Sequence, residues 1–169
     1  MTAGTLPSKW FVAYTRPKME KKVEIQMRQM GYETYLPLCW EVRRWSDRLK
    51  RLEVPLFPSY VFVRSEPVVG VDLFSIREFV NFVKFDKRPA LVNDSEIKII
   101  KCILNEDTEV QTEAYLQKGT RVRVTAGQFA GLEGIVIKRN DKTHLVIKVD
   151  GLMKAFSFTV SQSLLEVIG

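Results

Sequence analysis

The first 105 residues contain short runs of hydrophobic residues that favour strands. β-Branched and aromatic residues dominate these runs, and side chains in an extended chain alternate between two faces. The predicted strands cover residues 10–14, 32–40, 59–63 and 80–85, with Pro37 interrupting the second. In the third, we expect Phe57, Ser59, Val61 and Val63 on one face, and Pro58, Tyr60, Phe62 and Arg64 on the other. Because both faces are apolar as far as Arg64, one should meet the core. The other is either covered by the chain or kept for a partner.

Two segments of the same region follow the period of a helix. The first carries an apolar stripe that we interpret as core, formed by Met19, Val23, Met27 and Met30. Pro17 suits its first turn and Gly31 its C-terminal cap. The second begins at Asn93–Glu96, which offers an N-cap and first-turn acids, and continues with the stripe Ile97, Ile100 and Leu104. A short helix is also expected within 68–76. The order of elements predicts an α+β domain, with helices packed on an antiparallel sheet.

The chain changes character after residue 105. Residues 106–117 hold four acidic residues and no basic ones, which predicts an acidic linker between two domains. Beyond it, strand patterns over 122–124, 135–137, 145–149 and 155–160 alternate with glycine-rich turns, as in a small β-barrel. The expected organisation is an N-terminal domain over 1–105, a linker over 106–117 and a C-terminal domain over 118–169.

Charge is distributed unevenly between these parts. Residues 1–105 carry 18 Lys/Arg against 12 Asp/Glu, whereas residues 106–169 carry eight of each, so the net charge of +6 belongs to the first part. The N-terminal domain could therefore lie near a polyanion, although the excess alone favours nucleic acid only weakly.

Other features narrow the class of protein. The sequence has neither an apolar run of membrane-spanning length nor a signal peptide, so we expect a cytoplasmic protein that does not bind membranes. Cys39 and Cys102 are isolated and are expected to be buried thiols, which predicts no metal site and no cofactor. His144 is the single histidine, and no catalytic grouping accompanies it, so an enzyme is disfavoured.

A basic segment over 41–53 is typical of an extended hairpin. Its cations are Arg43, Arg44, Arg48, Lys50 and Arg51, and Trp45 lies among them. Charge and stacking would suit contact with nucleic acid. A solvated hairpin tip is an equally good interpretation of the same residues.

Three motifs together resemble the NusG family of transcription factors. The strand PLFPSYVFV, residues 55–63, is similar to the family's signature strand, and FVNFVKF, residues 79–85, follows it. The third motif looks like a KOW motif and comprises Lys118, Gly119, Val122, Val124, Gly127, Phe129, Gly131, Gly134 and Val136. The resemblance implies an NGN domain followed by an SH3-like KOW barrel. It extends to specialised paralogues such as RfaH and the antiterminators of capsular polysaccharide operons, and the basic, aromatic-rich first domain favours that branch.

The resemblance also implies a function and a set of sites. Family members bind RNA polymerase at the clamp helices of its largest subunit, suppress pausing or termination, and recruit factors such as Rho or ribosomal protein S-ten through the KOW domain. The polymerase-binding patch would comprise Tyr14, Phe57, Tyr60, Phe62, Phe82 and Ile97. Upstream or non-template DNA would lie near Arg16 and Lys22, together with the basic hairpin.

One alternative is a ribosome-associated RNA-binding KOW protein. Such a protein should concentrate its charge on the barrel, but residues 118–169 carry only eight basic residues against four acidic ones. We further expect a monomer whose second domain is a β-barrel at rest, because glycines and β-branched residues oppose a helical form there. The acidic linker should leave the two domains loosely coupled.

Overall fold

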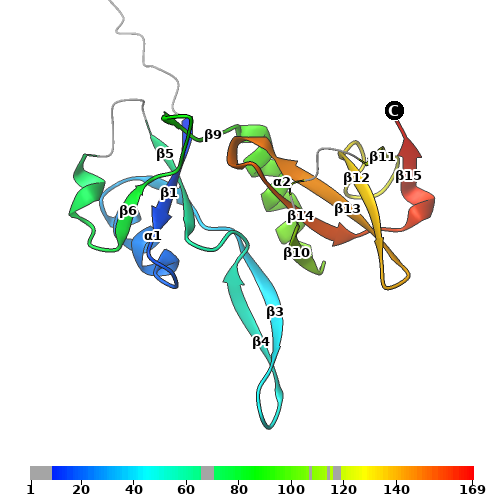
Figure 1. The fold of residues 1–169 in the computed structure, drawn as a ribbon, viewed down its shortest axis with the longest axis horizontal. Helices are drawn as coiled ribbons and strands as arrows, with labels where there is room; N and C mark the ends of the chain where they lie inside the picture. Colours follow the sequence, from blue (N-terminus) through cyan, green and yellow to red (C-terminus); the bar gives the residue numbers. More distant parts are fainter. Residues whose placement is uncertain (1–8, 66–70, 107, 114, 116–118) are drawn as a thin grey trace, which may run out of the picture.

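The computed structural model describes residues 9–65, 71–106, 108–113, 115 and 119–169 of the 169-residue chain (Figure 1). The elements of the first part are β1 (Lys9–Thr15), α1 (Glu20–Gln29), β2 (Glu33–Tyr35), β3 (Leu38–Arg44), β4 (Leu49–Pro55), β5 (Tyr60–Ser65), the 3-10 helix η1 (Asp72–Ser75), β6 (Phe79–Phe82), β7 (Lys84–Phe85), β8 (Arg88–Pro89), β9 (Leu91–Val92) and α2 (Asp94–Leu104). Those of the second part are β10 (Val110–Glu113), β11 (Thr120–Val124), β12 (Glu133–Arg139), β13 (Lys142–Val149), η2 (Asp150–Leu152), β14 (Lys154–Thr159), η3 (Gln162–Leu164) and β15 (Leu165–Val167). The expected α+β fold with a following all-β domain is confirmed.

The N-terminal sheet is antiparallel, with β1 at its centre. Its order is β2-β5-β1-β6, and β9 also pairs with β1. α1 covers one face, where it buries Val23 and Met27 against Ala13, Val61 and Val63. The other face carries Trp10, Val12 and Phe62, which belong to a second and larger core cluster. Both faces of the signature strand are therefore covered along most of its length.

The α1 helix is shorter than its methionine stripe predicted. It begins at Glu20 rather than near Pro17, because Lys18 adopts a left-handed φ of 65° that interrupts the helical backbone. Met19 and Met30 flank the helix and are exposed, so only the middle of the stripe is core. The predicted cap is confirmed at Gly31, whose φ is 93°.

The α2 helix begins where its sequence predicted. Asn93 and Glu96 form a reciprocal capping box, which satisfies backbone N–H groups of the first turn. Ile97, Ile100 and Ile103 are its buried residues. Cys102 is free and exposed, contrary to the expected buried thiol, because it precedes Ile103 and so lies off the apolar stripe.

Two predicted strands have different limits. The strand expected over 59–63 begins at Tyr60, because Ser59 adopts a left-handed φ of 66° in the preceding turn. The backbone N–H of Ser59 donates a hydrogen bond to Oε1 of Glu20 at 2.7 Å, which ties this turn to the start of α1. The strand expected over 80–85 is divided at Val83 into β6 and β7.

The second domain is a six-stranded antiparallel sheet in the order β10-β14-β13-β12-β11-β15. All four strands predicted there are present, so the prediction of a β-structured resting state is confirmed. Part of the predicted acidic linker is not a linker, because Val110–Glu113 forms β10 and pairs along β14. Val110 is buried and Glu113 accepts hydrogen bonds from Arg139 and Ser157 of the barrel, which explains why this segment folds with it. The remaining domain limits stay a prediction.

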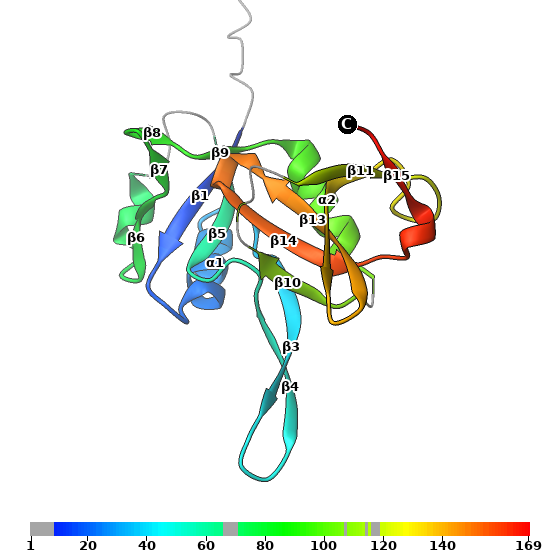
Figure 2. The ribbon, with the colours of Figure 1, turned by 45° about the vertical axis from the view of Figure 1, so that its right-hand side comes forward.

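The two domains share one core, so the prediction of loose coupling is wrong. The ring of Phe57 packs against Phe156 of β14, and both rings are fully buried. η2 packs against β9, and the backbone N–H of Asp150 donates a hydrogen bond to Oε1 of Glu96 at 2.9 Å. Figure 2 shows α2 lying behind the barrel strands at this junction. The domains therefore dock through buried apolar side chains of both, although the acidic composition of 106–117 predicted a linker that leaves them loosely coupled.

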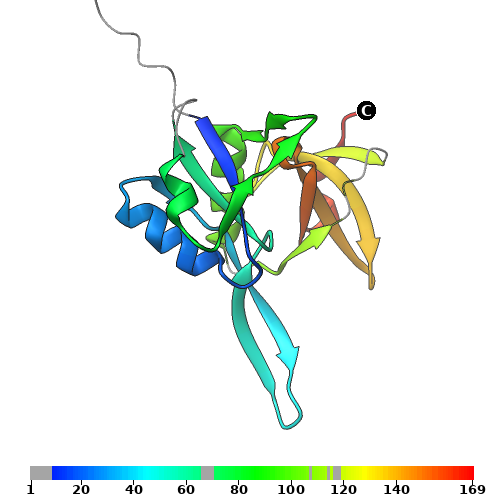
Figure 3. The same ribbon diagram turned by 60° about the vertical axis from the view of Figure 1, so that its left-hand side comes forward.

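The β3–β4 hairpin stands apart from this core. All views show it extending away from the sheet and from the barrel (Figure 3). Among the residues that the structure describes, no helix is long and apolar enough to cross a membrane. That same part of the chain contains no cluster of histidine, cysteine and acidic side chains able to hold a metal ion.

Candidate functional site

Two of the predicted polymerase-binding residues form an accessible pair. Tyr14 of β1 and Tyr60 of β5 lie directly opposite each other in the register, and their rings meet edge to face with centroids 6.1 Å apart. Tyr14 is 40% exposed and Tyr60 is partly exposed. Lys154 of the barrel places its ammonium 5.1 Å from the Tyr60 ring centroid. Partial burial, with a smaller contribution from Tyr14, raises the pKa of Tyr60.

Three other predicted patch residues lie on the same side of the sheet but are not accessible. Phe57, Phe62 and Ile97 are each at most 2% exposed. They belong to the cluster that also contains Leu152 and Phe156 of the barrel. The barrel therefore occupies the surface that the sequence predicted as a free patch.

The structure separates Phe82 from these residues. Phe82 pairs with Ala13, so its side chain points to the α1 face of the sheet, where it contacts Phe11 and Phe79. Val83 and Phe85 pack instead against the cluster that includes Tyr60. The motif FVNFVKF contains three phenylalanines, Phe79, Phe82 and Phe85. Only the register of β6 on β1 shows that Phe82 lies on the face of the sheet opposite the tyrosines.

The predicted nucleic-acid-binding residues lie in two places. Arg16 follows β1 and Lys22 lies on α1, where its ammonium forms an ion pair with Glu78 at 2.6 Å. The hydrogen bond from Lys22 lowers the pKa of Glu78, so the carboxylate partly neutralises this corner of the domain. The hairpin holds all the other predicted cations.

The hairpin is a regular antiparallel ribbon. Its register runs from Leu38 opposite Pro55 to Arg44 opposite Leu49. Arg43 forms an ion pair with Glu41 at 3.0 Å, whereas Lys50 and Arg48 lie over the Trp45 ring, at 4.3 and 6.0 Å from its centroid. A second tryptophan, which the sequence analysis did not single out, occupies the same ribbon. Trp40 is 53% exposed, and the guanidinium of Arg51 lies 4.6 Å from its centroid.

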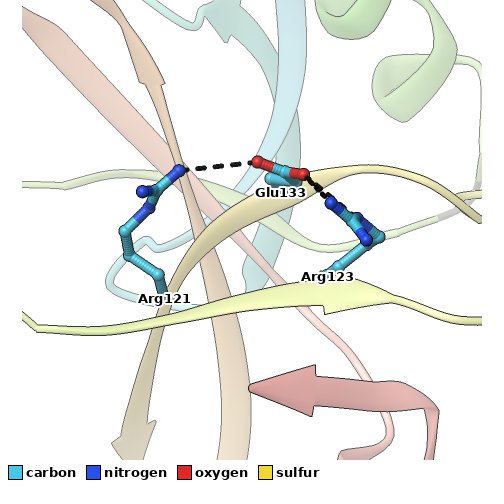
Figure 4. A network of polar contacts seen from close by, with 3 residues as sticks. All are labelled: Arg121, Arg123 and Glu133. Carbon is cyan, nitrogen blue, oxygen red and sulfur yellow. Dashed lines mark hydrogen bonds and ion pairs between the residues drawn. The ribbon is translucent and has the colours of Figure 1, made fainter. Parts of the chain in front are cut away.

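The barrel offers less charge to a partner than its composition suggests. Arg121 and Arg123 of β11 both bind Glu133 of β12, at 3.5 and 2.6 Å (Figure 4). Arg139 forms a hydrogen-bonded pair with Glu113. Three barrel arginines thus share two carboxylates of the same domain, which lowers the charge available to RNA, unlike the surface expected of a ribosomal RNA-binding protein.

Comparisons with known proteins agree with the order of the two domains and with their fold. A family model described as transcription termination factor nusG matches residues 8–101, and the KOW motif matches residues 118–150. The structure of Thermotoga maritima NusG, solved to describe its domain interaction, is similar with a TM-score of 0.58 at 22% identity, covering 98% of this chain and all of that one. The MjSpt4:Spt5 complex is more distant. Its conformations A and B give TM-scores of 0.32 and 0.34 at 14% and 15% identity, covering 95% of this chain and 98% and 97% of theirs.

The first model spans more than half of the chain, and the KOW motif follows it in the expected order. The sheet, the helices and the second, all-β domain match the fold of the bacterial NusG structure. This protein therefore belongs to the NusG family of transcription factors.

Proposed function

We propose that this protein binds RNA polymerase through the N-terminal domain and suppresses pausing or termination during elongation. The observation that carries the proposal is the Tyr14–Tyr60 pair, of which Tyr14 is exposed and Tyr60 partly exposed, at the position where the family resemblance expects the polymerase-binding patch. The partner expected there is the pair of clamp helices of the largest polymerase subunit. The basic N-terminal domain and its aromatic residues favour a specialised antiterminator over a general factor.

Binding to core RNA polymerase tests the proposal directly. Burying an aromatic ring stabilises a complex by about 1.5–3 kcal/mol, so Tyr14→Ala with Tyr60→Ala should weaken binding about tenfold or more. Phe74→Ala is the matched control, because Phe74 is also an exposed aromatic residue but lies on η1, outside this face. A folded double variant that binds polymerase like the parent would refute the proposal.

The docked barrel adds a condition to polymerase binding. Phe57 and Phe62 are buried in a core that includes Phe156, so a partner that needs these rings must first displace the barrel. Tyr14 and Tyr60 remain accessible and would make the first contact. We therefore expect polymerase to bind more tightly to variants whose domains are separated.

The cations of the first domain are proposed to lie near upstream or non-template DNA. A substitution that removes one phosphate contact should lower the slope of log affinity against log salt by about one. Arg44→Glu and Lys22→Glu, tested separately on elongation complexes, compare the hairpin with the α1 corner. Because Lys22 already pairs with Glu78, we expect the larger change from Arg44. A salt slope equal to the parent's in both variants would assign these residues to a solvated surface.

The KOW domain is proposed to recruit a further factor, with Rho or ribosomal protein S-ten as candidates from the family. Its loop at η2 packs on β9 in this structure. Recruitment by that loop would thus also require the domains to separate. A pull-down with parent and domain-separated variants measures this directly.

A further inference from the structure

β15 is an edge strand of the barrel sheet. It is the last strand in the order β10-β14-β13-β12-β11-β15, and β11 is its one partner among the strands that the structure describes. Figures 1 and 2 show β15 on the side of the barrel that lies away from the N-terminal sheet. An unpaired strand edge presents backbone N–H and C=O groups that can pair with another chain.

The hydrogen bonds to β11 identify which backbone groups of β15 face the open edge. In an antiparallel pair, alternate residues direct their N–H and C=O groups to the same neighbouring strand. The N–H of Ile168 donates to the carbonyl of Arg121. The carbonyl of Leu164 likewise accepts from the N–H of Thr125. The even-numbered residues therefore bond to β11, so Val167 directs its N–H and C=O groups to the open edge.

The side chain of Val167 faces the barrel interior and is nevertheless exposed. Val167 lies opposite Val122 in the register, so both side chains lie on the same face of the sheet. Val122 is 2% exposed, whereas Val167 is 66% exposed. The difference arises because the described sheet ends at β15, which leaves an apolar side chain of the inner face uncovered.

A cavity of about 230 Å³ opens beside this side chain. Its apolar walls include Val122, Val136, Leu165 and Val167, and we call it the barrel mouth. Pockets for drug-sized ligands have volumes of roughly 300–1,000 Å³, so the barrel mouth is better matched to one apolar side chain. A pocket beside an open strand edge is the arrangement that recognises extended peptides, because backbone bonds at the edge give affinity and the pocket selects a side chain.

One charged side chain lines the barrel mouth, and it is basic. Lys138 lies near the end of β12, two residues after Val136, and so shares the inner face of that strand. Within the described part of the chain, no acidic side chain lines the cavity, and Lys138 forms no ion pair. The neighbouring Arg139, by contrast, pairs with Glu113. The ammonium of Lys138 therefore favours a partner that brings a carboxylate to the barrel mouth.

We propose that β15 and the barrel mouth bind an extended acidic peptide segment of a partner protein as an added strand. One apolar side chain of the peptide enters the cavity. A carboxylate two residues away, on the same face of the added strand, pairs with Lys138. The inference goes beyond the proposed function and does not rest on it, because neither the tyrosine pair nor η2 takes part. Val167 is exposed while the domains are docked, so binding here does not require them to separate.

A second copy of this chain fits the barrel mouth less well. Pairing of β15 with the β15 strand of another copy would offer Val167 to the cavity. Glu166 is the acidic residue of this strand, and it directly precedes Val167, so its side chain points to the opposite face. A second copy would therefore leave Lys138 without a carboxylate.

NMR titration of the isotope-labelled full-length protein tests the proposal. The probe is a synthetic octapeptide of threonines, which favour an extended backbone, with one leucine and a glutamate two residues after it. Matched control peptides replace the leucine by serine or the glutamate by lysine. We expect the probe to shift the Val167 amide with a Kd of about 1 mM or tighter, and each control peptide to bind at least about threefold more weakly.

Three substitutions at exposed positions assign the contacts. Val167→Thr keeps the β-branched shape but brings a hydroxyl to the cavity, so it should weaken binding of the probe about threefold or more. Lys138→Glu should weaken it about tenfold and reverse the preference, so that the lysine peptide binds more tightly than the glutamate peptide. Lys142→Glu is the control for charge, because Lys142 lies opposite Arg139 on the other face of the hairpin. It should bind the probe within about twofold of the parent.

The outcomes distinguish the possible occupants. Unshifted β15 amides at about 1 mM probe would overturn the proposal, as would equal binding of the glutamate and lysine peptides to the parent. Shifts confined to η2 would overturn it by assigning the peptide to the loop that packs on β9. A dimer, measured by light scattering, that Val167→Thr dissociates would assign β15 to a second copy and overturn it as well. Val167→Thr should bind core RNA polymerase like the parent, so this inference and the proposed function can fail separately.

Discussion

Phe57 and Phe156 join the two domains, with ring centroids 6.2 Å apart and ring planes inclined by 72°. Phe57 lies in the turn before β5, and Phe156 lies on β14, so residues far apart in the sequence form one aromatic contact. Phe57 also meets Phe62 edge to face at 6.3 Å. The signature strand is therefore linked to the barrel through a continuous aromatic core, and changes at this junction should affect both domains.

Gly151 provides the most selective way to open the junction. A Cβ at this position would collide with the backbone carbonyl of Leu91. Backbone cannot move aside as a flexible side chain can, so Gly151→Ala should separate the domains while each remains folded. We expect a larger radius of gyration by small-angle X-ray scattering and tighter binding to core RNA polymerase.

Met153→Ala is the matched control for that variant. Met153 lies two residues away and is exposed, so its truncation should leave the domains docked. A Gly151→Ala protein as compact as the parent, with unchanged polymerase binding, would show that η2 and β9 do not hold the junction closed.

Replacement of serine by glycine should have opposite effects on the free energy of unfolding at positions 59 and 65. The left-handed φ of 66° at Ser59 costs a non-glycine residue about 1–2 kcal/mol, which glycine avoids at the expense of greater freedom in the unfolded chain. Ser59→Gly should therefore change the free energy of unfolding by between zero and about 1 kcal/mol in the stabilising direction. Ser65→Gly, at the end of β5, should destabilise by about 1 kcal/mol. Urea denaturation compares the two, and a destabilised Ser59→Gly would contradict the argument.

Glu20 should matter through the hydrogen bond that it accepts from Ser59. Glu20 is buried, and its replacement by alanine leaves that N–H without a partner, which costs about 1–3 kcal/mol. Glu20→Gln keeps an acceptor oxygen and should cost less. Hydrogen exchange of the Ser59 amide should accelerate in Glu20→Ala alone. Glu33→Ala, an exposed glutamate on β2, should stay within about 0.5 kcal/mol of the parent.

The sequence predicted the helices and most strands well because these depend on interactions between residues that are close together in the chain. The capping residues at Asn93 and Glu96, the β-branched runs of the barrel and the glycine after α1 each act within a few residues. The face of Phe82 depends instead on the pairing of β6 with β1, and a pairing register is a long-range property. Phenylalanines recur every third residue in FVNFVKF, so alternation along a strand did not show which of them would share the face of the tyrosines.

The sequence also failed to predict the docked barrel, for a related reason. Phe57 and Phe156 are apolar wherever they lie, and nothing in either neighbourhood identifies the other as its partner. The acidic composition of 106–117 favoured a linker, yet Val110 pairs with Phe158 and its neighbours complete the barrel sheet. Trp40 was the last residue of the strand predicted over 32–40, and only the structure shows that it belongs to an outward hairpin and is exposed.

Glu113 should make the barrel sensitive to acid. Burial raises the pKa of this carboxyl group, but hydrogen bonds from Arg139 and Ser157 and the charge of Arg139 outweigh burial and leave the pKa below its ordinary value of 4.5. A carboxylate whose pKa is lowered by folding stabilises the native state above the unfolded pKa. That stabilisation is lost as the pH falls through the folded pKa. The contribution of Glu113 should therefore be complete at neutral pH and decline below pH 4.5.

Glu113→Gln measures that contribution. At pH 7 the variant should be less stable by about 1–3 kcal/mol, because the charge-assisted bonds to Arg139 are weakened and β10 is held less firmly. As the pH falls below 4.5, the parent should lose stability faster, so that the two unfolding free energies converge. Glu166→Gln on β15 removes the same charge from an exposed position and should stay within about 0.5 kcal/mol of the parent at pH 7. A constant difference between parent and Glu113→Gln from neutral to acidic pH would show that packing of the side chain, rather than its ionisation, holds β10 in place.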